Sequence, residues 1–64
     1  MALKGKTPKY SRGQRVYSKT WGSNATVVAS DNTRSFRTVF YIIRLDGATK
    51  DSYNIPEHLL APPR

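Results

Sequence analysis

The sequence predicts an all-β domain, on three observations. The stretch 38–47 (TVFYIIRLDG) is the densest run of β-branched and aromatic residues in the chain, and such residues favour strands. It ends at Asp46-Gly47, a strong hairpin signal because glycine accepts the positive φ of the turn. No segment shows a sustained helical period or an internal repeat. We therefore expect a small sheet with this stretch as its central wall.

The first strand is expected at 15–19, launched by a turn at 12–14. Alternation turns Val16 towards the core and puts Arg15 and Tyr17 on the opposite face. Residues 21–24 (WGSN) have the composition of a loop. The second strand is expected at 25–29, with Ala25, Val27 and Ala29 facing inward, followed by a polar loop at 30–35.

The third strand is expected to begin near Phe36 and to run to the Asp-Gly turn. One parity is wholly apolar or aromatic and is expected to face the core, whereas the other ends in Arg44 and Asp46. The inward set is Val39, Tyr41, Ile43 and Leu45.

A fourth strand, 51–55, is expected to return antiparallel with Tyr53 and Ile55 inward. Pro56 ends it, because proline donates no hydrogen bond to a ladder. Residues 56–60 (PEHLL) predict a single helical turn with proline at its first position. Ala61 is expected to begin a last short strand before Pro62-Pro63.

The length of 64 residues fits one domain near the lower limit for a self-sufficient core. With no cysteine, one histidine and four carboxylates, the chain offers no disulfide and little material for a metal site. We therefore expect no metal and no cofactor. Neither a membrane-span length of apolar residues nor a secretion signal is present, so we expect a soluble intracellular protein, cytoplasmic or nucleoid-associated.

Positive charge is the strongest functional signal. Eleven Lys and Arg against four acidic residues give a formal net charge of +7. Such an excess on a short chain favours polyanionic partners, nucleic acid first. Simple solubility and an acidic protein partner are the alternatives.

Residues 1–10 are expected to form a flexible basic arm, since they carry three lysines and few apolar groups. Such an arm either follows a phosphate backbone or is a solvated tail. Its lysines are Lys4, Lys6 and Lys9.

The order of these pieces resembles the SH3-like small barrels, a group that includes KOW, Tudor and chromo-type domains. The resemblance covers roughly 10–62 and implies a five-stranded barrel over 11–62 with one 3₁₀ turn before the last strand. The KOW motif usually has glycine where Ala25 stands. The group binds DNA, RNA, peptides and modified lysines, so the resemblance leaves function open. The motifs that carry it are Gly13-x-x-Val16, Trp21-Gly22 before Ala25-Thr26-Val27, YIIRLDG at 41–47, and Ile55-Pro56-Glu57-x-Leu59-Leu60.

The stretch 52–56 (SYNIP) followed by Leu59-Leu60 also resembles, weakly and locally, the plasmid-borne type II dihydrofolate reductases. Those are SH3-like chains whose tetramer forms a central pore. Their pore-lining Val-Gln-Ile-Tyr motif is absent at the matching place. An oligomeric enzyme with a site between chains is therefore a third functional class to weigh.

The candidate binding face is a basic and aromatic stripe on the first strand. Arg15, Tyr17 and Lys19 share one parity, and Trp21 follows two residues later. Cations hold phosphates and aromatic rings stack on bases, although Tyr17 and Trp21 are equally suited to covering the edge of a small core. Further cations expected to extend this face are Arg34, Arg37 and Arg44, with the arm lysines Lys4, Lys6 and Lys9.

Two other features have competing interpretations. Phe40 and Ile42 form either an apolar interface patch, for a homo-oligomer or a partner protein, or the second buried face of a bent strand. An aromatic cage for methyl-lysine, from Tyr17, Trp21, Phe40 and Tyr53, conflicts with the positive net charge.

No catalytic constellation is visible, and His58 has only Glu57 as a neighbouring acid. We expect no enzyme activity in a single chain. The sequence favours a nucleic-acid-binding protein, DNA before RNA, with weak sequence preference. A protein-interaction module that docks on an acidic partner is the alternative.

Overall fold

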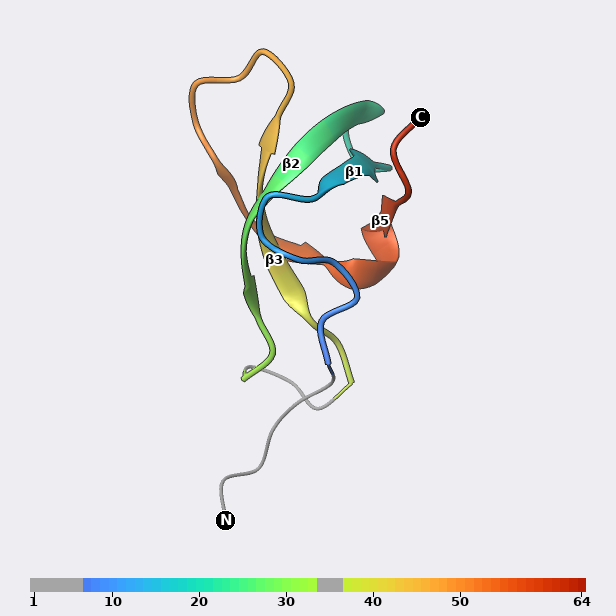
Figure 1. The fold of residues 1–64 in the computed structure, drawn as a ribbon, viewed down its shortest axis with the longest axis vertical. Coiled ribbons are helices and arrows are strands. Elements are labelled where there is room, and N and C mark those ends of the chain that lie inside the picture. The colour runs from blue at the N-terminus through green and yellow to red at the C-terminus, as the bar shows by residue number, and fades with distance from the viewer. Residues whose placement is uncertain (1–6, 34–36) are drawn as a thin grey trace.

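The computed structural model describes residues 7–33 and 37–64. Five antiparallel strands form one curled sheet with a single 3₁₀ turn, which confirms the all-β prediction (Figure 1). No helix in these two ranges is long and apolar enough to cross a membrane. The elements are β1 (Arg15–Ser18), β2 (Ser23–Asp31), β3 (Phe40–Leu45), β4 (Ser52–Pro56), η1 (Glu57–Leu59) and β5 (Leu60–Ala61).

The curl of the sheet follows from a short connection between its two edges. The strand order is β4-β3-β2-β1-β5, so β4 and β5 are opposite edges although only η1 separates them in sequence. Five flat strands would put the edges about 19 Å apart, at roughly 4.8 Å per spacing. Four extended Cα steps reach at most about 14 Å, and a 3₁₀ turn covers less. The sheet must therefore bend until its edges approach each other.

The core lies inside this curl. Val39, Tyr41 and Ile43 are buried and Leu45 packs against them, which confirms the inward parity of β3. Phe40 and Ile42, on the other parity, are half-buried. Each of these two side chains is thus covered in part and exposed in part. The other core residues are Tyr10, Val16, Ala25, Val27, Ile55 and Leu60.

A β-bulge in β2 changes which residues face the core. Val27 pairs with Ile43, but Ala29 pairs with Ile42, so β2 has one extra residue between these pairs. An extra residue reverses the alternation beyond it. The prediction that Ala29 faces inward is therefore wrong, because Ala29 shares the half-buried outer face with Ile42.

A second bulge lies in β4 and corrects the prediction for Tyr53. Tyr41 pairs with Ile55 whereas Ile43 pairs with Ser52, so two residues of β4 lie opposite one of β3. Asn54, one of these two residues, adopts a φ of 60°, a left-handed conformation that asparagine tolerates better than most residues. Ile55 is buried as predicted, but Tyr53 is 64% exposed.

A buried hydrogen-bonded cluster ties the N-terminal segment to the sheet. The Tyr41 hydroxyl donates to Glu57 Oε2 at 2.7 Å and accepts from the backbone N–H groups of Lys9 and Tyr10 at 3.0 and 3.2 Å. The Lys9 N–H also donates to Glu57 Oε2 at 3.1 Å. Tyr10 packs edge-on against Tyr41, with 5.8 Å between the ring centroids. Lys9 and Tyr10, the last two residues of the expected arm, are therefore bound to the sheet, whereas residues 1–6 of the arm lie outside the described ranges.

Removing the Tyr41 hydroxyl is expected to lower the free energy of unfolding by about 1–3 kcal/mol, because the buried Glu57 carboxylate loses one of its donors and the N–H groups of Lys9 and Tyr10 lose an acceptor. Urea unfolding of Tyr41→Phe measures this loss. Tyr53→Phe, which alters an exposed hydroxyl, is the control and is expected to change stability by less than about 0.5 kcal/mol. Equal stability of the two variants would contradict the role given to this cluster.

The Tyr41 hydroxyl also makes the stability of the fold depend on pH in the alkaline range. Burial and the hydrogen bond to Glu57 raise the pKa of Tyr41 from 10.0 to about 12. The unfolded chain ionises first as pH rises, so the stabilisation from this tyrosine is complete below about pH 10 and is lost towards pH 12. We expect the stability of Tyr41→Phe to fall less than that of the wild type over this interval.

The positive φ of Asn54 in the β4 bulge leads to a prediction about which residues this position tolerates. Asn54→Val places a β-branched residue at positive φ and is expected to cost about 1–2 kcal/mol in urea unfolding. Asn54→Gly accepts the same backbone conformation and is expected to cost clearly less. A Gly variant as unstable as the Val variant would show that side-chain contacts of Asn54, rather than its backbone, dominate.

Candidate functional site

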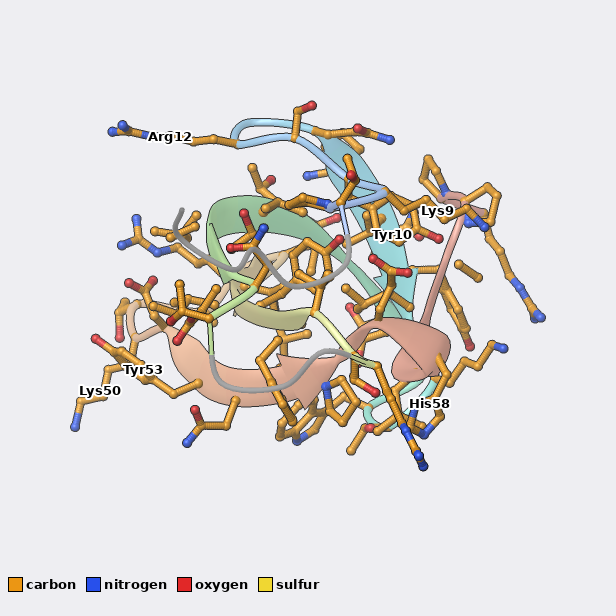
Figure 2. All side chains as sticks on the ribbon, turned by 90° about the horizontal axis from the view of Figure 1, so that it is seen from below. Lys9, Tyr10, Arg12, Lys50, Tyr53 and His58 are labelled. Atoms are coloured by element: carbon orange, nitrogen blue, oxygen red, sulfur yellow. The ribbon has the colours of Figure 1, made fainter. Side chains whose placement is uncertain are left out.

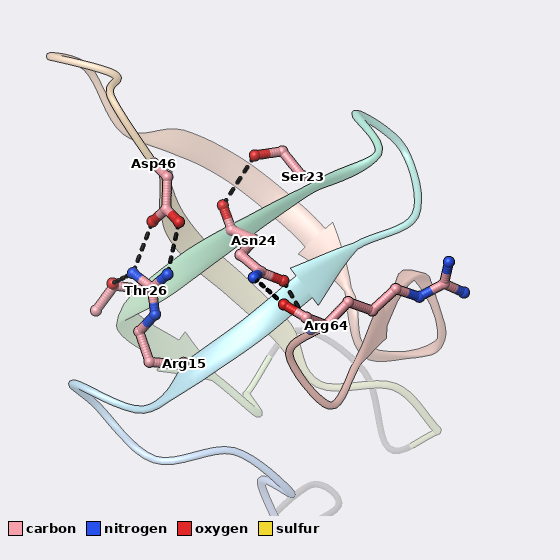
Figure 3. A network of polar contacts seen from close by, with 6 residues as sticks. All are labelled: Arg15, Ser23, Asn24, Thr26, Asp46 and Arg64. Carbon is pink, nitrogen blue, oxygen red and sulfur yellow. Dashed lines mark hydrogen bonds and ion pairs between the residues drawn. The ribbon is translucent and has the colours of Figure 1, made fainter.

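Arg15, the first cation of the predicted binding face, is neutralised by an ion pair. Arg15 forms a two-pronged ion pair with Asp46, with Nη–Oδ distances of 2.6 and 2.5 Å, and also donates to Thr26 Oγ1 at 3.2 Å (Figure 3). The strand register explains this contact, since Arg15 pairs with Thr26 on β2 and Thr26 pairs with Arg44 on β3. Hydrogen bonds from Arg15 lower the pKa of Asp46 below its usual value.

The ring of Tyr17, the aromatic residue of the predicted β1 face, is covered by another side chain. The Arg64 guanidinium lies 4.4 Å from the centroid of the Tyr17 ring. The Asn24 side chain holds the C-terminal residue in place: Nδ2 donates to the Arg64 carbonyl at 2.6 Å, and the Arg64 N–H donates to Oδ1 at 2.9 Å (Figure 3). Tyr17 pairs with Asn24 across β1 and β2, so one register determines both contacts.

Lys19 turns away from Arg15. β1 ends at Ser18, and the Lys19 backbone N–H donates to the Leu59 carbonyl at 2.9 Å. Its ammonium lies 3.4 Å from the His58 carbonyl oxygen, so this lysine belongs to the side of the molecule that carries η1. Trp21 follows in the same turn and is 50% exposed.

A basic depression forms where four segments meet. These are the N-terminal segment, the turn after β1, the approach to β3, and η1. Lys9 and His58 lie on one side of the molecule in Figure 2, and Arg12 and Lys50 lie on the opposite side. The depression measures about 330 Å³ and is lined by Lys9, Tyr10, Lys19, Arg37, Thr38, Glu57, His58 and Leu60.

The charge of the basic depression is clearly positive. Lys9, Lys19 and Arg37 contribute three cations, against the single carboxylate of Glu57. That carboxylate is buried and accepts hydrogen bonds from the Tyr41 hydroxyl and the Lys9 N–H. Such a site can bind an oxyanion through ammonium and guanidinium donors and the Thr38 hydroxyl.

A second depression, of about 400 Å³, lies beside the β3–β4 turn and is more apolar. Its charged groups already have partners, since Arg44 Nε lies 2.8 Å from Asp51 Oδ1 and Asp46 is paired with Arg15. Its arginine and its aspartate are therefore both engaged in ion pairs within the chain. Its lining residues are Thr26, Val28, Arg44, Leu45, Asp46, Gly47 and Ala48.

The structure thus divides Tyr17 and the predicted cations into three groups. Arg15, Tyr17 and Arg44 are engaged in contacts within the chain, whereas Lys9, Lys19 and Arg37 meet at the basic depression. The remaining predicted cations, Lys4, Lys6 and Arg34, lie outside the described residues.

Sequence reasoning missed Tyr10, Thr38, Glu57 and His58 as parts of this site. The predicted turn at 56–60 contained a usable signal, because it placed Glu57 and His58 beside the last strand. No group of three or more His, Cys, Asp or Glu residues in 7–33 and 37–64 is arranged to hold a metal ion.

No model of a known protein family, no curated protein and no solved structure matches the chain significantly.

Proposed function

We propose that this chain is a small nucleic-acid-binding protein that anchors a phosphate group in the basic depression. The observation that carries the proposal is the convergence of Lys9, Lys19 and Arg37, from three separate segments, on one concave site. Elsewhere on the described surface, Arg15 and Arg44 are paired with carboxylates. Phosphate is the anionic group common to all nucleic acids, and its neutralisation dominates their affinity for proteins.

Phosphate anchoring implies weak sequence preference, because backbone contacts carry no direct sequence information. Trp21 is half-exposed in the same turn as Lys19, so it is the available stacking residue for a neighbouring base. DNA is proposed before RNA, in an intracellular setting in the cytoplasm or on the nucleoid. The curled five-stranded sheet with a 3₁₀ turn before its last strand supports a relationship to the SH3-like barrels.

An acidic protein is the second candidate partner, because the same cations would receive carboxylates. The half-buried Phe40 and Ile42 offer limited apolar area for such a contact. This gives nucleic acid the advantage, since charge alone provides most of its non-specific binding.

The basic depression is tested by two double variants of equal net charge. Lys9→Ala/Lys19→Ala is expected to weaken binding of single-stranded DNA about tenfold or more and to reduce the slope of log K against log salt by about 1.4, at roughly 0.7 per phosphate contact. Arg12→Ala/Lys50→Ala, which removes two exposed cations on the opposite side, is the control. Fluorescence of Trp21, the single tryptophan, measures both titrations.

Equal losses in the two double variants would indicate diffuse attraction by net charge and contradict a defined site. A wild-type protein without saturable binding to single-stranded DNA, duplex DNA or RNA at low salt would overturn the proposed function. Circular dichroism and urea unfolding of each variant establish that the fold is retained.

Arg15 and Lys19 separate the predicted β1 face from the basic depression. Both single alanine variants lower the net charge by one, but Arg15 is already paired with Asp46. We therefore expect Lys19→Ala to weaken DNA binding several-fold more than Arg15→Ala in the same titration. A larger loss for Arg15→Ala would return the binding site to the β1 face.

A further inference from the structure

We propose that Arg64 and Tyr17 form a stacking platform on which an unpaired nucleobase lies against the guanidinium, so that the protein binds single strands in preference to duplexes. This inference rests on the proposed function, because it names the form of nucleic acid that the protein takes. Three features of the structure carry it: the contact between the two side chains, the bonds that hold Arg64 in place, and the donors that its guanidinium still offers.

The guanidinium of Arg64 lies over the ring of Tyr17, with 4.4 Å between its central carbon and the ring centroid. A guanidinium is planar, so a ring that covers one side of it leaves the other side open. Arg64 is exposed, and Tyr17 beneath it is half-buried. Nucleobases stack on guanidinium planes as well as on aromatic rings. The pair therefore presents to solvent a cationic surface that suits the face of a base.

The backbone of Arg64 is fixed to the sheet. The Asn24 side chain donates to the Arg64 carbonyl oxygen at 2.6 Å and accepts from the Arg64 N–H at 2.9 Å (Figure 3). Asn24 is also the cross-strand partner of Tyr17, so one strand pair supports both members of the platform. Pro62 and Pro63 precede Arg64, and their fixed φ limits the freedom of this segment. A surface held in this way loses little conformational entropy when a base binds.

The N–H groups of the Arg64 guanidinium are available to a ligand. Within 7–33 and 37–64, the contact with Tyr17 is the one interaction that this guanidinium makes. Arg15 and Arg44 differ, because their guanidinium groups are paired with carboxylates. The Arg64 donors can therefore bind a base edge or a phosphate oxygen while the face of the group is stacked.

The platform lies close to the basic depression. Lys19 lines the depression and follows Tyr17 by two residues, which puts their Cα atoms at most about 7 Å apart. The Tyr17 hydroxyl lies at the turn after β1, since a side-chain carbon added at Gly22 would be 3.6 Å from it. The half-exposed Trp21 belongs to the same turn. A strand whose phosphate binds Lys19 can thus place a neighbouring base on Arg64.

Stacking on this platform selects for bases that are unpaired. In a duplex each base is paired and stacked on its neighbours, so exposing its face costs free energy. A single strand offers such faces at a much lower cost. Phosphate contacts alone give a single strand no advantage, because the duplex has the higher charge density. A preference for single strands would therefore come from the platform.

The test compares three ligands of equal length: a single strand, the duplex of the same sequence, and an abasic strand that keeps every phosphate but lacks the bases. Fluorescence anisotropy of a dye on each ligand measures the affinity at fixed salt. We expect the wild type to bind the single strand about fivefold or more tightly than the other two, as one stacked base predicts. Arg64→Lys keeps the charge, removes the plane and is expected to lose most of this preference. Arg12→Lys, the same change at another exposed arginine, is the control and is expected to keep it.

Every other result counts against the platform. If Arg64→Lys keeps the wild-type preference, charge at this position suffices and the inference is overturned. If Arg64→Ala binds the single strand more tightly than the wild type, Arg64 is a cap that keeps bases away from Tyr17, which also overturns it. Wild-type binding of the single strand no tighter than that of the duplex and the abasic strand would overturn this inference and leave the proposed function standing. No saturable binding to any nucleic acid would overturn both.

Discussion

The hydrogen bond between Tyr41 and Glu57 is the contact on which the rest of the structure depends. It joins β3, the central wall of the core, to η1, the turn that connects the two edges of the sheet. A buried carboxylate without such partners would cost several kcal/mol, so its hydrogen bonds must form together with the core around it. The same hydroxyl accepts hydrogen bonds from the N–H groups of Lys9 and Tyr10 and thereby holds the N-terminal segment against the sheet. In the described parts of the chain, no buried side-chain nitrogen or oxygen lacks a hydrogen-bond partner.

This arrangement links architecture to charge. The short η1 connection forces the sheet to curl and brings Glu57 and His58 beside the turn that carries Lys19. Tyr41 positions the backbone of Lys9 at the same place. Lys9 and Lys19 are thus held by the contacts that close the fold, and the buried Glu57 carboxylate offsets part of the repulsion between the cations of the basic depression. Stability and the candidate binding site share one set of interactions.

Local sequence signals predicted most of the fold. Alternation placed Val16, Tyr41 and Ile43 in the core, the Asp-Gly pair predicted the turn at Gly47, and Pro56 predicted η1. The errors at Ala29 and Tyr53 share one physical cause, an extra residue that reverses alternation within a strand. Such bulges depend on how two strands pair, so a single strand's pattern does not reveal them. The candidate site was less predictable for the same reason: Arg15 and Asp46 are 31 residues apart, and only the sheet register brings them together.

The two edges of the sheet also bear on how this protein behaves at high concentration. An unpaired edge strand is a template on which a second chain can add its own strand and begin an aggregate. β5 offers a template of only two residues, and β4 is interrupted by the bulge at Asn54, whose left-handed backbone breaks the regular row of donors and acceptors. Bulged and very short edges are devices that oppose edge-to-edge aggregation. The bulge that turns Tyr53 outward therefore also protects a protein with so small a core from polymerising through its own backbone.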